Sequence, residues 1–172
     1  MALRRATAGL ALLGCVLAPG WVNALEPAAS WTHHLQTVDA ALARGDISAA
    51  VQEWHQGFAA ALRGRTWLGL VEVGDAYLRI AEVGGFRGSA KPMARHLYLE
   101  ALVQAKSQRS PEGALRVAAA FARLGDRGVV EQCVRVAESA ARRQRDAHAL
   151  HEVAAARERL ALTLVHRREG KR

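Results

Sequence analysis

A glycine-centred turn recurs every 40 residues along this chain, and it constrains the fold more than any other feature. Gly45, Gly85 and Gly125 each lie between two segments in which apolar residues repeat with the period of a helix. A fixed period in an otherwise helical sequence is typical of helix pairs that stack side by side. The sequence therefore predicts an all-α fold made of repeated antiparallel helix pairs.

Seven helical segments are expected from this periodicity. Ala dominates the apolar residues and aromatic residues make up 5% of the chain, a balance that favours helix over strand. The expected segments are residues 32–44, 47–62, 67–83, 92–105, 111–124, 128–142 and 146–165. In the connections Gly45–Asp46 and Gly125–Asp126, the glycine suits a left-handed helix end and the aspartate suits the start of the next helix.

The middle connection differs from these two, because residues 84–89 contain three glycines and no aspartate. We expect a longer loop here, with the next helix starting near Pro92, since proline suits the first turn of a helix. The glycine amides, the free N–H groups at that helix start, and the charges of Arg87 and Lys91 together could form an anion-binding site, and the alternative is an ordinary flexible connection.

The first 24 residues have the order of parts found in a secretory signal peptide. Arg4 and Arg5 precede an apolar stretch, residues 6–18, that is too short to span a bilayer permanently. Val22 and Ala24 then occupy the two positions that signal peptidase reads. We therefore expect cleavage after Ala24 and export to the periplasm.

The chain is thus expected to consist of three parts: a cleaved signal peptide (1–24), a helical-repeat domain (25–165) and a basic disordered tail (166–172). Two other destinations stay open. One is secretion beyond the envelope. The other is a lipoprotein, because residues 12–15 are similar to a lipobox, which would make Cys15 the anchored residue.

Arginine supplies most of a positive net charge. The whole chain has 24 basic and 16 acidic residues, and removal of Arg4 and Arg5 with the signal leaves 22 basic residues and a net charge of +6. A moderate charge of this sign on an exported protein indicates attraction to anionic envelope lipid or cell-wall polymer. It does not indicate binding to nucleic acid.

No segment carries a catalytic or cofactor-binding motif, so the sequence predicts a protein that is not an enzyme and needs no cofactor. His148 and His151 lie three residues apart, whereas zinc-hydrolase helices space such a pair four apart. Two histidines are also too few for a closed metal site. Cys133 shares a helical stripe with apolar residues and is expected to be buried.

The second helix of each expected pair carries a small, a large and a small residue at spacings of four and three. The pattern reads Ala50, Trp54, Gly57, then Ala94, Tyr98, Ala101, and in a degenerate form Val130, Val134, Ala137. In this pattern, over residues 31–143, the chain resembles tetratricopeptide and Sel1-like repeat proteins. The resemblance implies a short α-solenoid whose last helix, at 146–165, caps the end of the stack.

The same resemblance implies a concave groove that is lined by the first helix of each pair and binds a peptide or protein partner. The groove positions are then Leu35, Asp39, Leu42, Leu68, Asp75, Leu78, Arg79, Glu112, Leu115 and Arg123. We therefore expect an interaction or scaffold module of the bacterial cell envelope. The alternative is a basic surface, formed by the C-terminal arginines, that binds anionic envelope lipid or cell-wall polymer.

Overall fold

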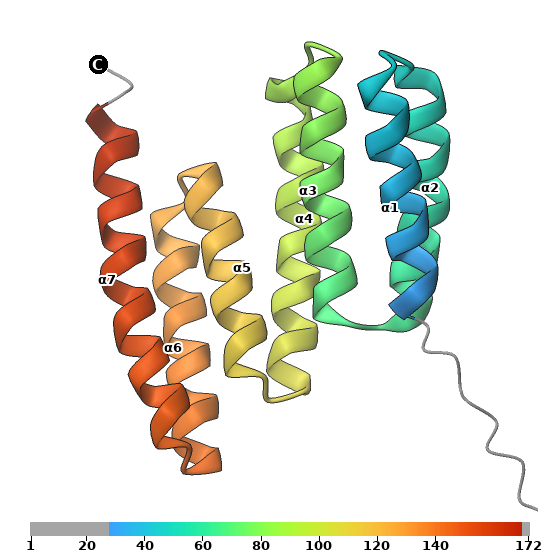
Figure 1. Cartoon of the computed structure of the whole chain (residues 1–172). Helices are drawn as coiled ribbons and strands as arrows, with labels where there is room; N and C mark the ends of the chain where they lie inside the picture. Colours follow the sequence, from blue (N-terminus) through green and yellow to red (C-terminus); the bar gives the residue numbers. More distant parts are fainter. Residues whose placement is uncertain (1–27, 170–172) are drawn as a thin grey trace, which may run out of the picture.

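The computed structural model describes the backbone of residues 28–169 and the side chains of residues 31–165, and these residues form helices and no strand. The helices are α1 (Ala28–Ala43), α2 (Ile47–Gly64), α3 (Trp67–Val83), α4 (Arg87–Ser107), α5 (Pro111–Leu124), α6 (Arg127–Gln144) and α7 (Ala147–Glu169). Figure 1 shows successive pairs stacked in sequence order, from α1 and α2 at one end to α7 at the other. The prediction of an all-α, solenoid-like stack of helix pairs is confirmed.

A glycine in the left-handed conformation ends the first helix of each pair. The φ angles of Gly45, Gly85 and Gly125 are 74°, 75° and 84°, a region that costs a residue with a Cβ atom about 1 kcal/mol or more. Asp46 and Asp126 then accept a hydrogen bond from the backbone N–H three residues further on, as the sequence predicts. The 40-residue repeat therefore marks the turn inside each pair.

The turns between pairs use arginine in the same left-handed region, a feature that the glycine pattern did not reveal. Arg65, Arg109 and Arg145 have φ angles of 49°, 52° and 55°. These turns are also linked to one another: the side-chain amide of Gln108 donates to the carbonyl of Arg65 at 2.9 Å, and that of Gln144 donates to the carbonyl of Arg109 at 2.7 Å. Each pair is thus tied to the next along its edge.

The connection before α4 is shorter than predicted. Helix α4 starts at Arg87 rather than near Pro92, so the proline lies inside the helix and part of the expected loop is helical. The ring of Phe86 packs against Tyr77, with 6.3 Å between centroids, and Ala90 is fully buried. Tertiary packing therefore holds an extra turn even though Pro92 lacks an N–H to donate. The predicted boundary was wrong because it gave the proline its usual place at a helix start.

Aromatic side chains fill the space between successive pairs. Trp54 of α2 lies against Tyr77 of α3 with 4.7 Å between ring centroids, and Tyr98 of α4 meets Phe121 of α5 edge-on at 5.7 Å. A Cβ atom on Gly74 would lie 2.6 Å from the Tyr98 ring, so α3 and α4 approach closely only because this residue is glycine. The small and large residues of the predicted second-helix pattern are all buried, which confirms their packing role.

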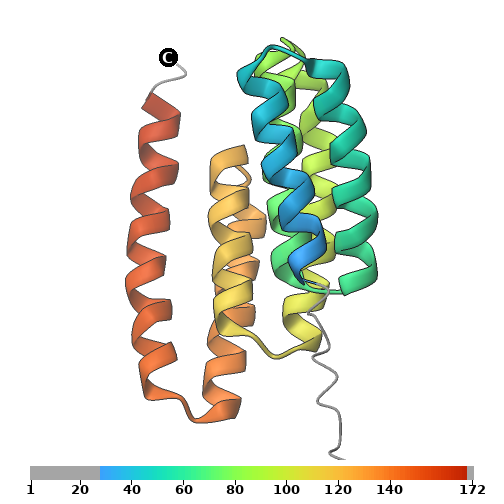
Figure 2. The ribbon, with the colours of Figure 1, turned by 45° about the vertical axis from the view of Figure 1, so that its right-hand side comes forward.

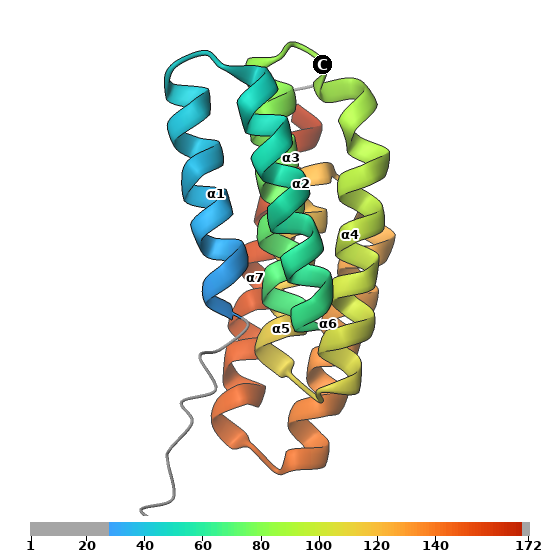
Figure 3. The same cartoon turned by 90° about the vertical axis from the view of Figure 1, so that its right-hand side faces the viewer.

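The stack curves toward its first helices, α1, α3, α5 and α7. Cα atoms of successive first helices approach within 8 Å of each other along the whole stack, whereas among the second helices α4 and α6 do so and α2 and α4 do not. Figure 3 looks along the stack from the end that carries α1 and α2, with α7 behind. The first helices therefore line the inner side of the curve, and we call this surface the inner face.

Helix α7 covers the end of the stack and packs on both α5 and α6. Its Val153, Ala156 and Leu160 are buried, as expected of a capping helix. The C-terminal end of α7 extends past the end of α5 (Figure 2), and the helix continues to Glu169 rather than ending at 165. The predicted signal peptide, Cys15 and the last three residues of the predicted tail lie outside the described residues.

Candidate functional site

Three hollows follow one another along the inner face. The first lies mainly between α1 and α3 and has a volume of about 300 Å³. The second lies where α3, α4 and α5 meet, with a volume of about 530 Å³. The third lies between α5 and α7 and is the largest of the three, with a volume of about 860 Å³. Arg116 of α5 lines both the first and the third hollow and so links them.

Most residues of the predicted groove line these hollows. Leu35 and Asp39 line the first, Leu78 and Arg123 the second, Asp75 and Arg79 both of these, and Glu112 and Leu115 the third. Leu42 and Leu68 line none of the three: Leu42 packs against the core, and Leu68 is exposed in the first turn of α3. The structure thus brings eight of the ten predicted positions to the inner face.

Four charged residues of the predicted groove pair with one another from helix to helix. The guanidinium of Arg79 donates two hydrogen bonds to the carboxylate of Asp39, at 2.9 and 3.2 Å. One pair further along, Arg123 donates to Asp75 at 2.5 Å. These contacts join α1 to α3 and α3 to α5, and we call them the charge ladder. Its members already hold the stack together, so their charges are largely neutralised before any ligand arrives.

The hydroxyl group of Tyr98 contacts Asp75, a member of the charge ladder. Its hydroxyl donates to the Asp75 oxygen that also accepts from Arg123, again at 2.5 Å. Burial raises the pKa of Tyr98 well above its ordinary value, and the neighbouring Asp75 carboxylate raises it further because both would be negative. The hydroxyl therefore stays protonated and serves as a fixed donor rather than as an acid or base.

The third hollow combines an apolar floor with charges that have no partner. Leu115 and Ala119 of α5 face Ala156 and Leu160 of α7 across it. Four residues around this floor have charged side chains that make no hydrogen bond or ion pair within the described part of the chain: Glu112, Arg116, Glu152 and Arg159. Unpaired charges of both signs beside apolar surface can hold a peptide by its side chains and its backbone.

Sequence reasoning did not place Arg116, Glu152 or Arg159 in the groove. Two of them lie on α7, which was predicted to be a cap, and Arg159 was predicted to belong to the alternative basic surface rather than to the groove. A signal was nevertheless available. Because α7 takes the place of a first helix in the repeat, Glu152 and Arg159 occupy the same inner side as the predicted residues of α5.

The two cations of the predicted anion site, Arg87 and Lys91, lie in a helix rather than beside a glycine loop. Arg87 and Lys91 lie in the first two turns of α4 rather than in a loop before it, so glycine amides do not form the predicted nest. Arg87 forms an ion pair with Glu82. Both cations nevertheless line the second hollow together with Arg79 and Arg123, which belong to the charge ladder.

Within residues 31–165, no three His, Cys, Asp or Glu side chains are grouped in a way that could hold a metal ion. Burial raises the pKa of the Cys133 thiol to about 12, so the group is neutral and enclosed at physiological pH. Among the described helices, none combines the length and apolar character needed to cross a membrane.

No protein-family model matches this sequence, and no curated protein matches it either. The candidate site is therefore defined by its own geometry: a row of hollows on the inner face, braced by the charge ladder and open for binding at the third hollow.

Proposed function

We propose that this chain is a non-enzymatic interaction module of the bacterial cell envelope whose inner face binds a segment of a partner protein. The observation that carries the proposal is the third hollow. It has a volume of about 860 Å³, and its apolar floor is bordered by unpaired charges of both signs. The predicted export signal supports an envelope location, and the resemblance to tetratricopeptide and Sel1-like repeats supports binding on this side of the stack.

The charge ladder supports the proposal by fixing the shape of the surface before binding. A groove whose walls are already held together loses little conformational entropy when a ligand enters, so more of the contact energy appears as affinity. The ladder also separates two sets of charged residues on the inner face, those that pair with one another and those without a partner. Asp39, Asp75, Arg79 and Arg123 brace the helices, while Arg116 and Arg159 are available to the partner.

The alternative function is binding of anionic envelope lipid or cell-wall polymer through the C-terminal arginines, which are Arg142, Arg143, Arg145, Arg157, Arg159, Arg167 and Arg168. The first three are all exposed around the turn between α6 and α7. Arg142 is partly neutralised, because it donates a hydrogen bond to Glu138 at 2.5 Å, and Arg143 hydrogen-bonds to Ser139. Neither Arg143 nor Arg145 has an acidic partner within the described residues.

Affinity capture from an envelope extract distinguishes the two functions. The full chain is immobilised and capture is compared at about 0.05 M and about 0.5 M salt, where charge attraction at the surface is strongly screened. Two variants are run beside it: Leu115→Asp with Arg116→Glu on the inner face, and Arg143→Glu with Arg145→Glu on the basic turn. Circular dichroism verifies that both variants fold.

The proposal predicts a protein that is retained at high salt, lost by the inner-face variant and kept by the basic-turn variant. Capture of lipid or wall polymer alone, only at low salt, with loss in the basic-turn variant, would establish the alternative. A retained protein that is indifferent to the inner-face variant would contradict the proposed site.

A further inference from the structure

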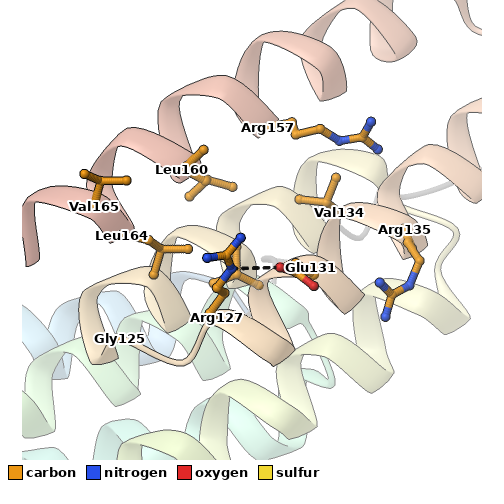
Figure 4. Close-up of a pocket in the computed structure, with 11 residues that line it drawn as sticks. Gly125, Arg127, Glu131, Val134, Arg135, Arg157, Leu160, Leu164 and Val165 are labelled. Atoms are coloured by element: carbon orange, nitrogen blue, oxygen red, sulfur yellow. Dashed lines mark hydrogen bonds and ion pairs between the residues drawn. The ribbon is translucent and has the colours of Figure 1, made fainter. Parts of the chain in front are cut away.

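A second groove lies outside the inner face, between the N-terminal half of α6 and the C-terminal half of α7. We call it the terminal groove; its volume is about 570 Å³. Val130 and Val134 of α6 face Leu160, Leu164 and Val165 of α7 across it. In Figure 4, Leu164 and Val165 lie toward one end of the view and the side chains of Arg135 and Arg157 toward the other. In the same view Arg127 lies on the side of Leu164 and Val134 on the side of Arg135, so apolar and basic side chains both line the groove along its length.

The start of a second helix covers the corresponding position in each preceding pair. At the start of α4, the Phe86 ring packs on Tyr77 of α3. At the start of α6, Asp126 forms an ion pair with Arg95 of α4, whose guanidinium also lies over the Phe121 ring of α5. Within the described residues, no helix covers α6 and α7 in this way. The terminal groove therefore corresponds to the positions that the starts of α4 and α6 cover within the stack, but no described helix covers it.

The charges around the groove indicate what kind of helix fits. Three arginines line it, and Glu131 is the single acidic residue among its lining residues. Arg127 is paired with Glu131 at 3.0 Å and Arg157 with Glu138 at 2.9 Å. Arg135 makes no ion pair or hydrogen bond within the described residues. An incoming acidic side chain would meet Arg135 much as Asp126 meets Arg95 inside the stack.

We propose that the terminal groove binds an amphipathic α-helix of a partner protein, with an apolar stripe on Leu160, Leu164 and Val165 and acidic residues beside Arg135. A second copy of this chain is a poor occupant, because pairing the groove with itself would bring arginines against arginines. The proposal does not rest on the inner-face function. The two surfaces use adjacent faces of α7 that are divided by Leu160, which lines both.

The proposal is tested with two designed helical peptides of about 20 residues, a length at which helix formation becomes appreciable. Both carry leucines at the i, i+3, i+4 and i+7 spacing, with glutamate on the flanks of the apolar stripe in one and lysine in the other. Binding to the purified full chain is followed by fluorescence anisotropy. We expect the acidic peptide to bind at least about tenfold more tightly than the basic one.

Two variants and two matched controls locate the binding site. Arg135→Glu on α6 is matched by Arg63→Glu on α2, because both residues are exposed arginines and both changes alter the net charge equally. Val165→Glu is matched by Val103→Glu on α4, since the two valines are 52% and 59% exposed. We expect Arg135→Glu to weaken the acidic peptide about fivefold and Val165→Glu at least about tenfold. Each control should change affinity less than about twofold.

Several outcomes would overturn the proposal. One is the absence of saturable binding by the acidic peptide, and another is equal affinity for the two peptides. A third is a loss of binding in the inner-face variant carrying Leu115→Asp and Arg116→Glu but not in Val165→Glu, because that result would locate the peptide in the third hollow. A fourth is self-association of the full chain, measured by sedimentation, that Val165→Glu abolishes, since a second copy would then occupy the groove.

Discussion

The carboxylate of Asp75 joins the second pair to the third, because one of its oxygens accepts hydrogen bonds from both Tyr98 and Arg123. Replacing it by asparagine keeps the shape but removes the charge. We expect Asp75→Asn to lower the free energy of unfolding by about 1–2 kcal/mol, since hydrogen bonds to a charged group are lost. Asp39→Asn is the matched control and should cost less than about 1 kcal/mol, because the Asp39–Arg79 pair is more exposed. Urea denaturation measures both, and equal losses would contradict this ranking.

The same substitution should change the titration of Tyr98. Burial and the Asp75 carboxylate both raise the pKa of this phenol in the folded chain. Its contribution to stability is therefore complete below the unfolded pKa of about 10 and declines as the pH rises above that value. We expect Asp75→Asn to lower the pKa of Tyr98, since the repelling negative charge is gone. Ultraviolet titration of the two tyrosines measures this, and an unchanged upper pKa would show that Asp75 does not act on the phenol.

At the scale of the helix, the closeness of α3 to α4 depends on one missing side chain. In Gly74→Ala the new Cβ atom would lie 2.6 Å from the fully buried ring of Tyr98, which has no room to retreat. We expect this change to lower the free energy of unfolding by about 1–3 kcal/mol, in spite of alanine's better helix propensity. Gly88→Ala is the control: nothing lies within 4 Å of a Cβ atom there, and it should stabilise α4 by up to about 1 kcal/mol. Thermal unfolding of both variants tests the contrast.

The positions of the helices were largely predictable because their end signals are local. The start of α2 and both ends of α3 and α5 fall at the expected residues, where Asp46, Thr66 and Ser110 cap the helix starts. The start of α4 was not predictable in the same way. Phe86 makes no side-chain cap hydrogen bond, and its packing against Tyr77 is a tertiary contact that local sequence does not record.

The candidate site was predictable as a surface but not in its charges. Helical periodicity identifies which residues share the inner side, and most of the predicted positions do line its hollows. It does not reveal which charges neutralise one another across helices. Asp39 and Arg79 are separated by 40 residues, the repeat period itself, so a search for opposite charges one period apart would have found this pair. Asp75 and Arg123 lie 48 apart and escape that search.

At the scale of the whole molecule, the buried thiol of Cys133 reports whether the third pair opens. In a stack each pair is held only by its neighbours, so parts of the molecule can open separately. In a chain that also carries Cys15→Ala, the native thiol should react with a thiol reagent at least about a thousandfold more slowly than in denaturant, because it is buried and its pKa is raised to about 12. Protection below about tenfold would show that α6 separates readily from the stack.

The charge ladder also makes the second pair a module that can be multiplied. Residues 67–110 carry an acid that meets the following pair, Asp75, and a base that meets the preceding one, Arg79. The first pair supplies only the acid Asp39 to the ladder, and the third supplies only the base Arg123. A tandem duplication of residues 67–110 would supply one acid and one base for the added junction, whereas doubling either neighbour would leave a charge without a partner of opposite sign. The second pair thus carries both the acid and the base that an added pair would need in order to join its two neighbours.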